Sequence, residues 1–275
     1  MIIHTSSDSI DFSNRAFSYG DGLFETMLVV SSKITLLKYH LARLCNGAAR
    51  LGIHFDKDDA AELAKRIQAL VANEDVAVVK VVLTRVAGGR GYRSLEEADS
   101  EVFLQVFSGF ERLEEAFVKQ GVAVRECKTR LACQPLLAGL KHLNRLENVL
   151  ARNEWYDEQF YEGLMLDTNG LLIEATQSNV FFLIGERWLT PELNYSGVNG
   201  VFRTWLLEKS ADLGINTAVS TLSLDDLSKA EGCFVCNSVN GILPVRSVTT
   251  LKGQTYQFSV EAAFSFSHLA RSVLN

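Results

Sequence analysis

The sequence predicts an α+β protein with two α/β domains, a small N-terminal one and a larger C-terminal one. β-branched apolar runs typical of buried strands alternate with stretches in which apolar residues recur every three or four positions, as on a helix. Apolar residues make up 47% of the 275 residues and proline only 3, which is typical of a compact chain with a sizeable core. The polar segment 108–115 separates two apolar regions, so we expect domains at 1–111 and 112–275.

The first domain is expected to combine β-strands with two amphipathic helices. A turn at 31–33 favours a hairpin, and the glycines around Asp21 favour a second turn where backbone approaches a ligand. A glycine-rich loop at 88–93 lacks the spacing of a nucleotide cradle but carries basic residues that suit carboxylates. The strands are expected at 24–30, 34–37, 76–85 and 102–107, and the helices from 40 past Gly52 and at 57–73.

The second domain is expected to alternate strands with helices in the same way. The Asn-Gly pair in the turn 168–170 favours a tight hairpin. The strands are expected at 122–127, 162–167, 171–182 and 233–236, and the helices after Lys141, at 204–213, at 222–232 and at 260–274.

Lys141 lies where a loop or strand is expected to enter an amphipathic helix. Leu143, Leu146, Val149 and Leu150 follow at helical spacing and would form its apolar face. The preceding residues 136–140 are apolar, and apolar surroundings disfavour a charged amine. A neutral lysine amine is the form needed for a nucleophile that condenses with a carbonyl group. The alternative is a solvated lysine at a helix N-terminus.

Three further features suit an anionic or heterocyclic ligand. Arg43, beside the apolar face of its helix, is either a solvated arginine or a phosphate ligand. Glu174 closes an apolar run, where a carboxylate is costly unless it is paired. Gly200, just before the expected helix at 204–213, would expose backbone N–H groups to an anion or serve as a simple N-cap.

Charge and composition exclude several classes of function. The net charge is −6, so bulk charge recruits neither nucleic acid nor an anionic membrane. We find no membrane-spanning run and no signal peptide, and the odd count of 5 cysteines favours reduced thiols in a cytoplasmic protein. The C-x-x-C pair Cys233 and Cys236 lies in an apolar run and is expected to be core packing. The histidines have no metal-binding spacing, so we expect no metal site.

Two motifs carry a resemblance to a known family. The string 140–147 resembles the active-lysine segment of aminodeoxychorismate lyases, and residues 19–26 are similar to a stretch widespread in fold type IV pyridoxal-phosphate (PLP) enzymes. The resemblance implies fold type IV, with a pseudo-barrel second domain, PLP as cofactor and a homodimer. It also implies a site between the two domains and near the partner chain.

The resemblance implies a role for individual residues. Lys141 would be the Schiff-base lysine, Glu174 of the Glu-x-x-x-Ser-Asn pattern would face the pyridine nitrogen, and Thr26 would relay a proton. The phosphate is assigned to Arg43, Gly200, Val201, Phe202 and Ser238, and the substrate to Arg90, Tyr92 and Asn237. Tyr92 stands about where D-amino-acid aminotransferases have a histidine.

The implied activity is a lyase that releases pyruvate and 4-aminobenzoate, a folate precursor, from 4-amino-4-deoxychorismate. The alternatives are a type IV aminotransferase acting on D- or branched-chain amino acids and a catalytically silent binding protein on the same fold. Branched-chain enzymes more often have glycine at the position of Thr26 and tyrosine about where Leu146 falls, so both residues favour the lyase.

Overall fold

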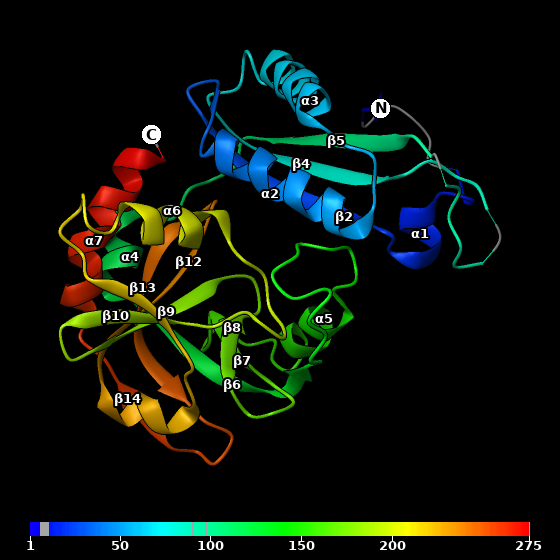
Figure 1. Cartoon of the computed structure of the whole chain (residues 1–275). Helices are drawn as coiled ribbons and strands as arrows, with labels where there is room; N and C mark the ends of the chain where they lie inside the picture. The colour runs from blue at the N-terminus through cyan, green and yellow to red at the C-terminus, as the bar shows by residue number, and fades with distance from the viewer. Residues whose placement is uncertain (6–10, 90, 97, 275) are drawn as a thin grey trace. The chain divides into compact units, whose positions relative to one another are not determined.

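The computed structural model describes residues 1–5, 11–89, 91–96 and 98–274, and it divides into two compact units (Figure 1). Residues 1–111 form the first unit together with 140–144 and Leu274, and residues 112–139 and 145–273 form the second. We expected residues 140–144 in the second domain. They belong to the first unit instead, because their backbone is hydrogen-bonded to a strand of its sheet.

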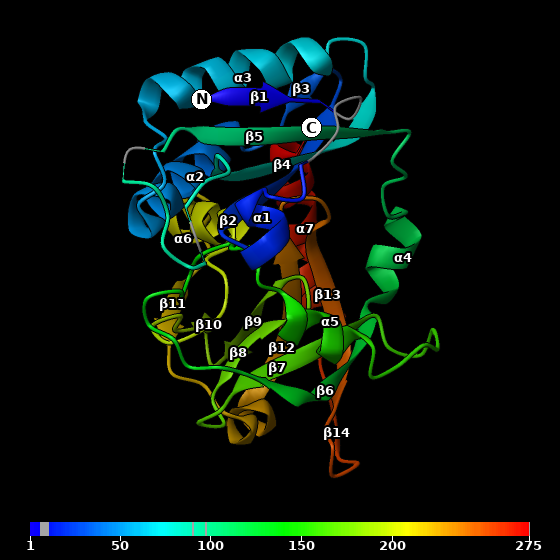
Figure 2. The same cartoon turned by 90° about the vertical axis from the view of Figure 1, so that its right-hand side faces the viewer.

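The first unit is built on a mixed sheet in the order β1-β5-β4-β2-β3, of which β1, β5 and β4 are seen side by side in Figure 2. Strand β1 pairs in parallel with β5, and the other neighbours are antiparallel. The expected hairpin is confirmed, because β2 and β3 pair across the turn at 31–32. The bounds are β1 (Ile2–His4), β2 (Gly22–Val30), β3 (Lys33–Ile34), β4 (Val76–Arg85) and β5 (Ser100–Ser108).

Helices α1 (Arg15–Tyr19), α2 (Leu37–Leu51) and α3 (Lys57–Leu70) complete the first unit. Helix α2 packs against β2 and α3. The expectation that α2 runs past Gly52 is wrong: Gly52 has φ +66° and its N–H donates to carbonyls of the last turn, which ends the helix. Helix α3 begins at a capping box in which Asp56 is the N-cap residue.

The second unit is built on a curled mixed sheet in the order β11-β10-β9-β12-β13-β6-β7-β8, with β14 paired to β13. Parallel pairing occurs at β6–β7, β6–β13 and β10–β11. The bounds are β6 (Val122–Leu131), β7 (Glu162–Asp167), β8 (Leu172–Ala175), β9 (Asn179–Ile184), β10 (Arg187–Pro191), β11 (Thr217–Ser220), β12 (Ala230–Asn237), β13 (Gly241–Thr249) and β14 (Thr255–Gln257).

Short helices border this second sheet. The helix expected at 222–232 is only one 3₁₀ segment, after which β12 begins, and the expected strand 171–182 is interrupted by a turn. Cys233 and Cys236 are buried in β12, which confirms their role in the core. Helix α7 packs against β12 and β13. The bounds are α4 (Glu115–Gln120), α5 (Leu146–Arg152), α6 (Val201–Lys209), η1 (Leu224–Lys229) and α7 (Val260–Val273).

Candidate active site

Lys141 lies on an extended segment beside β2, not at the start of a helix. The Phe24 N–H donates to the Lys141 carbonyl (2.9 Å) and the Leu143 N–H to the Gly22 carbonyl (3.0 Å). The expected helix begins only at Leu146, so the prediction of a helix entered at Lys141 is wrong. The Lys141 Nζ lies 4.1 Å from the centre of the Phe24 ring. The backbone of β2 thereby fixes the main chain of the candidate lysine.

The apolar face expected after Lys141 is largely exposed. Leu146, Val149 and Leu150 keep 75%, 50% and 61% of their surface accessible. Helix α5 therefore does not bury these side chains within the chain, contrary to the expectation that they form a core face. Exposed apolar clusters of this kind are typical of surfaces that meet another molecule.

Glu25 of β2 is fully buried and binds two basic side chains of α2. Its carboxylate accepts hydrogen bonds from Arg43 Nε (2.7 Å) and Nη2 (2.5 Å) and contacts His40 Nδ1 at 2.6 Å. Burial opposes the charged form of Glu25, but the attraction of Arg43 and His40 outweighs it and lowers the pKa of Glu25 to about 2. Burial lowers the pKa of His40 in spite of the neighbouring carboxylate. The Glu25 carboxylate is thus ionised and orients the guanidinium of Arg43.

Sequence analysis gave Glu25 and His40 no role of their own, although a signal was present. Side chains alternate between the two faces of a strand, so Glu25 shares a face of β2 with Leu23 and Met27. The side chains of Leu23 and Met27 are both buried. A carboxylate on a buried face requires a cationic or hydrogen-bonding partner, and the basic residues of the following helix supply it.

Thr26 lies on the opposite face of β2 from Glu25, together with Phe24. Both residues are half-buried. Residues two apart on a strand point to the same side of the sheet. Thr26 therefore lies on the same face of β2 as Phe24, whose ring lies under the Lys141 amine. Lys141 and Thr26 are thus placed on one face of β2, while Arg43 is bonded to Glu25 on the other.

In the second unit, Glu174 of β8 is buried with 4% of its surface accessible. Its Oε2 accepts a hydrogen bond from the Val198 N–H at 2.8 Å. Asn179 holds the same turn at both ends: its amide donates to the Val198 carbonyl (2.9 Å), and its Oδ1 accepts from the Gly200 N–H (3.1 Å). Glu174 and the glycine turn before α6 are thus parts of one hydrogen-bonded assembly.

Gly200 is the N-cap residue of α6, and no side chain caps that helix end. A Cβ at Gly200 would lie 2.1 Å from Asn179 Oδ1, so only glycine fits there. The helix begins at Val201, earlier than the expected 204, which places the N–H groups of Val201 and Phe202 in its first turn. An uncapped first turn offers donors and a partial positive charge to an anion.

Asn237 is the last residue of β12 and Ser238 follows it, next to the start of β9, since Cys236 pairs with Asn179. The Asn237 amide donates to Ser178 Oγ (3.1 Å), and its Oδ1 accepts from the N–H groups of Val239 and Asn240. Asn237 thus stabilises the turn between β12 and β13.

Glu162 of β7 is a fully buried carboxylate that was not predicted as a site residue from the sequence. It accepts hydrogen bonds from Thr176 Oγ1 (2.8 Å) and Ser178 Oγ (2.6 Å). Burial raises the pKa of Glu162, and the hydrogen bonds from the two hydroxyls only partly offset it. Glu162 therefore fixes the turn between Glu174 and Asn179.

Two of the three residues expected to meet the substrate, Arg90 and Tyr92, belong to the segment 88–93, and the third, Asn237, lies in the second unit. Tyr92 keeps 90% of its surface accessible, and its ring packs edge-on against Tyr19. Arg90 lies outside the described residues. In the part of the chain that the structure describes, no group of three or more His, Cys, Asp or Glu side chains could hold a metal ion. No helix within the described ranges is long and apolar enough to cross a membrane.

Comparison with known proteins identifies the family. The sequence model of Amino-transferase class IV matches residues 22–248. The chain belongs to this family. It is 33% identical over 240 residues to an aminodeoxychorismate lyase from Vibrio harveyi, covering 87% of this chain and 88% of that protein.

Solved structures agree with the expected fold type IV. A 4-amino-4-deoxychorismate lyase from Pseudomonas aeruginosa is 39% identical, with a TM-score of 0.85, over 97% of this chain and 94% of that one. A PLP-bound hypothetical aminotransferase from Mycobacterium tuberculosis, 19% identical, shares the fold with a TM-score of 0.77 over 97% and 93% of the two chains. Class IV aminotransferases use PLP.

The described residues fit PLP in three respects. The uncapped start of α6 in the second unit and, separately, the Arg43 guanidinium in the first unit are each suited to binding a phosphate. The buried carboxylate of Glu174, with a backbone N–H on one oxygen, suits a protonated ring nitrogen. Lys141 supplies a primary amine on a segment held by the backbone of β2.

Proposed function

We propose that this protein is a PLP-dependent lyase that converts 4-amino-4-deoxychorismate to 4-aminobenzoate and pyruvate. The observation that carries the proposal is identity of 33% and 39%, over nearly the whole chain, to two proteins named for this activity. Thr26 adds support, since it keeps a hydroxyl beside the Phe24 ring that lies under the Lys141 amine.

In this proposal Lys141 holds PLP covalently, Glu174 pairs with its ring nitrogen, and Arg43 binds its phosphate. The N–H groups of Val201 and Phe202 and the Ser238 hydroxyl complete the phosphate site, whereas the Gly200 N–H, expected to join them, donates to Asn179 Oδ1 instead. When bound, PLP withdraws electrons from the carbon that carries the substrate amine. The role of Glu25 is then to hold Arg43 in the orientation that the phosphate requires.

Two proton transfers are assigned to residues of the chain. Lys141, as a free amine, would take the proton from the ring carbon that bears the substrate amine. The ring becomes aromatic as the ether bond to the enolpyruvyl group breaks. The departing methylene carbon gains a proton, which Thr26 relays because a hydroxyl is too weak an acid to supply one unaided. The sum is an elimination that needs no oxidant and no second substrate.

The substrate carries two carboxylates, and we assign them to the loop at 88–93, with Arg90 and Tyr92, and to Asn237. We further propose that the protein is a homodimer. The exposed apolar side chains of α5 support an assembly, because Leu146, Val149 and Leu150 would lose their contact with water in it.

The experiment that tests the function measures products from the PLP-loaded protein. We expect pyruvate and 4-aminobenzoate to appear in equal amounts from 4-amino-4-deoxychorismate, and pyruvate release to fall in the Thr26→Val variant while PLP stays bound. Transfer of an amino group from a D- or branched-chain amino acid to a keto acid, without pyruvate release from aminodeoxychorismate, would identify the aminotransferase instead. If the protein binds PLP but shows neither activity, the remaining alternative is a catalytically silent binding protein.

A further inference from the structure

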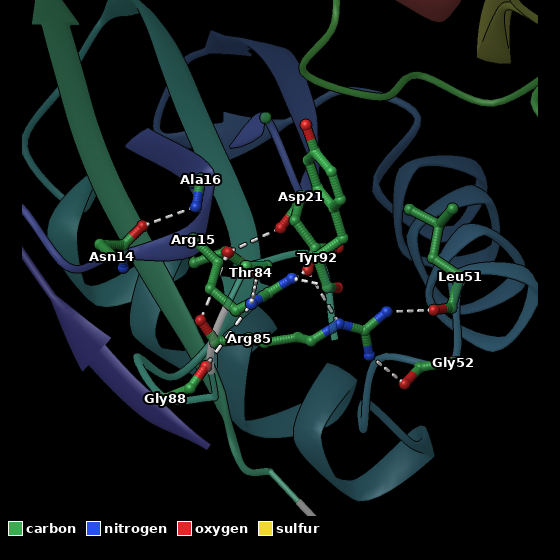
Figure 3. Close-up of polar contacts among 12 residues, drawn as sticks. Asn14, Arg15, Ala16, Asp21, Leu51, Gly52, Thr84, Arg85, Gly88 and Tyr92 are labelled. Carbon is green, nitrogen blue, oxygen red and sulfur yellow. Dashed lines mark hydrogen bonds and ion pairs between the residues drawn. The ribbon is translucent and has the colours of Figure 1, made fainter. Parts of the chain in front are cut away.

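We infer that Arg15, Asp21 and Arg85, here called the Asp21 network, position the loop at 88–92 relative to the Lys141 segment and so set substrate affinity. The inference rests on the proposed function in one point, the assignment of this loop to the substrate carboxylates. All parts of the network belong to the first unit and are drawn in Figure 3.

The centre of the network is a single oxygen of Asp21, in the turn between α1 and β2. Asp21 Oδ2 accepts hydrogen bonds from Arg15 Nε (2.8 Å) and from Arg85 Nε (3.0 Å) (Figure 3). Arg15 is buried, with 4% of its surface accessible. A buried guanidinium is stable only with a counter-charge and with acceptors for its remaining N–H groups, and Asp21 is that counter-charge.

The remaining nitrogens of Arg15 hold the loop by its backbone. Nη2 donates to the Tyr92 carbonyl (2.9 Å), and Nη1 donates to the carbonyls of Gly91 (3.3 Å) and Gly88 (3.5 Å). The described residues of this loop, 88, 89, 91 and 92, lie in neither helix nor strand, and Gly88, Gly89 and Gly91 all have positive φ. Such a segment lacks a hydrogen-bond ladder, so one planar side chain that binds three carbonyls determines its path.

Arg85 extends the network to the end of α2. Its Nη1 and Nη2 donate to the carbonyls of Gly52 and Leu51, where the helix terminates. Carbonyls at a helix C-terminus carry a partial negative charge, which a cation stabilises. Two arginines thus bind Asp21 Oδ2. Arg15 is also hydrogen-bonded to the loop, and Arg85 is also hydrogen-bonded to the end of α2.

The same turn is attached to the Lys141 segment on its other side. The Gly20 carbonyl accepts a hydrogen bond from Asn144 Nδ2, and the Gly22 carbonyl accepts one from the Leu143 N–H, both at 3.0 Å. A Cβ at Gly20 would lie 2.7 Å from Asn144 Oδ1, so the approach is close. Asp21 is therefore one residue from each attachment, and its carboxylate links the lysine segment to the loop.

This geometry makes Asp21 and Arg15 positioning residues and not groups that touch substrate. The distance between the loop and the Lys141 segment determines whether the loop can bind the substrate carboxylates while the reacting carbon lies at Lys141. Releasing the loop weakens binding of substrate. It leaves the phosphate-binding residues and the bonds that hold Lys141 to β2 in place, so KM changes while kcat and PLP affinity do not.

The test uses the PLP-loaded protein and the variants Asp21→Asn, Arg15→Lys and Asp212→Asn. Asp212 is a matched control, since its exposed ion pair with Lys209 lies in the second unit. Two quantities are measured: KM and kcat, and the rate at which trypsin cuts the native protein after Arg90 and Arg93, identified by mass spectrometry. Cleavage of a native segment reports its local opening and needs no enzyme activity.

We expect Asp21→Asn to raise both KM and the cleavage rate about tenfold, with kcat and PLP affinity within about twofold of the wild type. Arg15→Lys keeps the charge but loses the planar fork, so its effect should be as large. Asp212→Asn should change neither. Unchanged cleavage in Asp21→Asn overturns the inference, as does faster cleavage with unchanged KM. A joint fall in kcat, PLP affinity and melting temperature would show a merely structural role and also overturn it.

Failure of the proposed function is distinguishable from failure of this inference. If the wild type releases no pyruvate, KM is measured for D-alanine in transamination, because that substrate also carries a carboxylate. If neither reaction occurs, the cleavage rates alone decide whether the Asp21 network holds the loop, and an equal rate in Asp21→Asn and wild type refutes it.

Discussion

The carboxylate of Glu25 lies fully buried between His40 and Arg43, and this single group links strand β2 to helix α2. Arg43 donates two hydrogen bonds to it and His40 a third contact. The pair orients Arg43 in advance, which reduces the cost of ordering a long side chain when an anion binds.

Glu25 should make the stability of the protein depend on acid. Its pKa is lowered from 4.5 to about 2, so its contribution is complete above about pH 4.5 and is lost as pH falls towards 2. That lowering corresponds to about 3 kcal/mol of unfolding free energy. We expect Glu25→Gln, measured by denaturant unfolding without PLP, to lack this part of the acid dependence. Glu62→Gln, on the exposed side of α3, is the control, and parallel pH curves for Glu25→Gln and wild type would contradict the account.

At the scale of elements, β2 carries candidate site residues in the first unit and α6 carries them in the second. Strand β2 places Glu25 on its buried face and Phe24 and Thr26 on the other, and it binds the Lys141 segment along its edge. Helix α6 presents an uncapped N-terminus because Gly200 and Asn179 fold the preceding chain tightly against it.

Gly200→Ala should disrupt the start of α6. The added Cβ would meet Asn179 Oδ1 at 2.1 Å, so the amide must move and release the turn at Val198. We expect PLP affinity, measured by titration of absorbance, to fall about tenfold or more. Asn179→Ala removes the amide that the new Cβ would meet. The double variant Gly200→Ala with Asn179→Ala should therefore lose less PLP-binding free energy than the sum of the losses in the two single variants. Strict additivity would argue against a steric cause.

Most strands and the candidate residues could be predicted from the sequence, because alternation, β-branched runs and the Glu-x-x-x-Ser-Asn pattern are local signals. The helix after Lys141 could not. Residues 143–150 have helical spacing, yet the backbone of the first of them is bonded to β2, more than a hundred residues away in sequence. The end of α2 at Gly52 could have been predicted, since glycine there adopts the left-handed conformation that terminates helices. The Asp21 network could not, because it joins three separate segments.

At the scale of the whole molecule, the exposed apolar face of α5 bears on assembly. Leu150 keeps 61% of its surface accessible on a helix whose apolar spacing is regular. We expect Leu150→Glu to shift the protein from dimer towards monomer in sedimentation velocity, because a charge in an apolar interface is costly. Leu251→Glu, at an exposed turn position, should not. A wild type that sediments as an active monomer would refute the dimer.

We propose that Lys141 is the residue that carries PLP covalently. The most direct test of this proposal is reduction of the PLP-loaded protein with borohydride, followed by peptide mapping. We predict that the added mass of reduced PLP lies on Lys141, and that Lys141→Ala folds but yields no labelled peptide and no pyruvate. Labelling of a different lysine, or a Lys141→Ala protein that keeps full pyruvate release, would contradict the account.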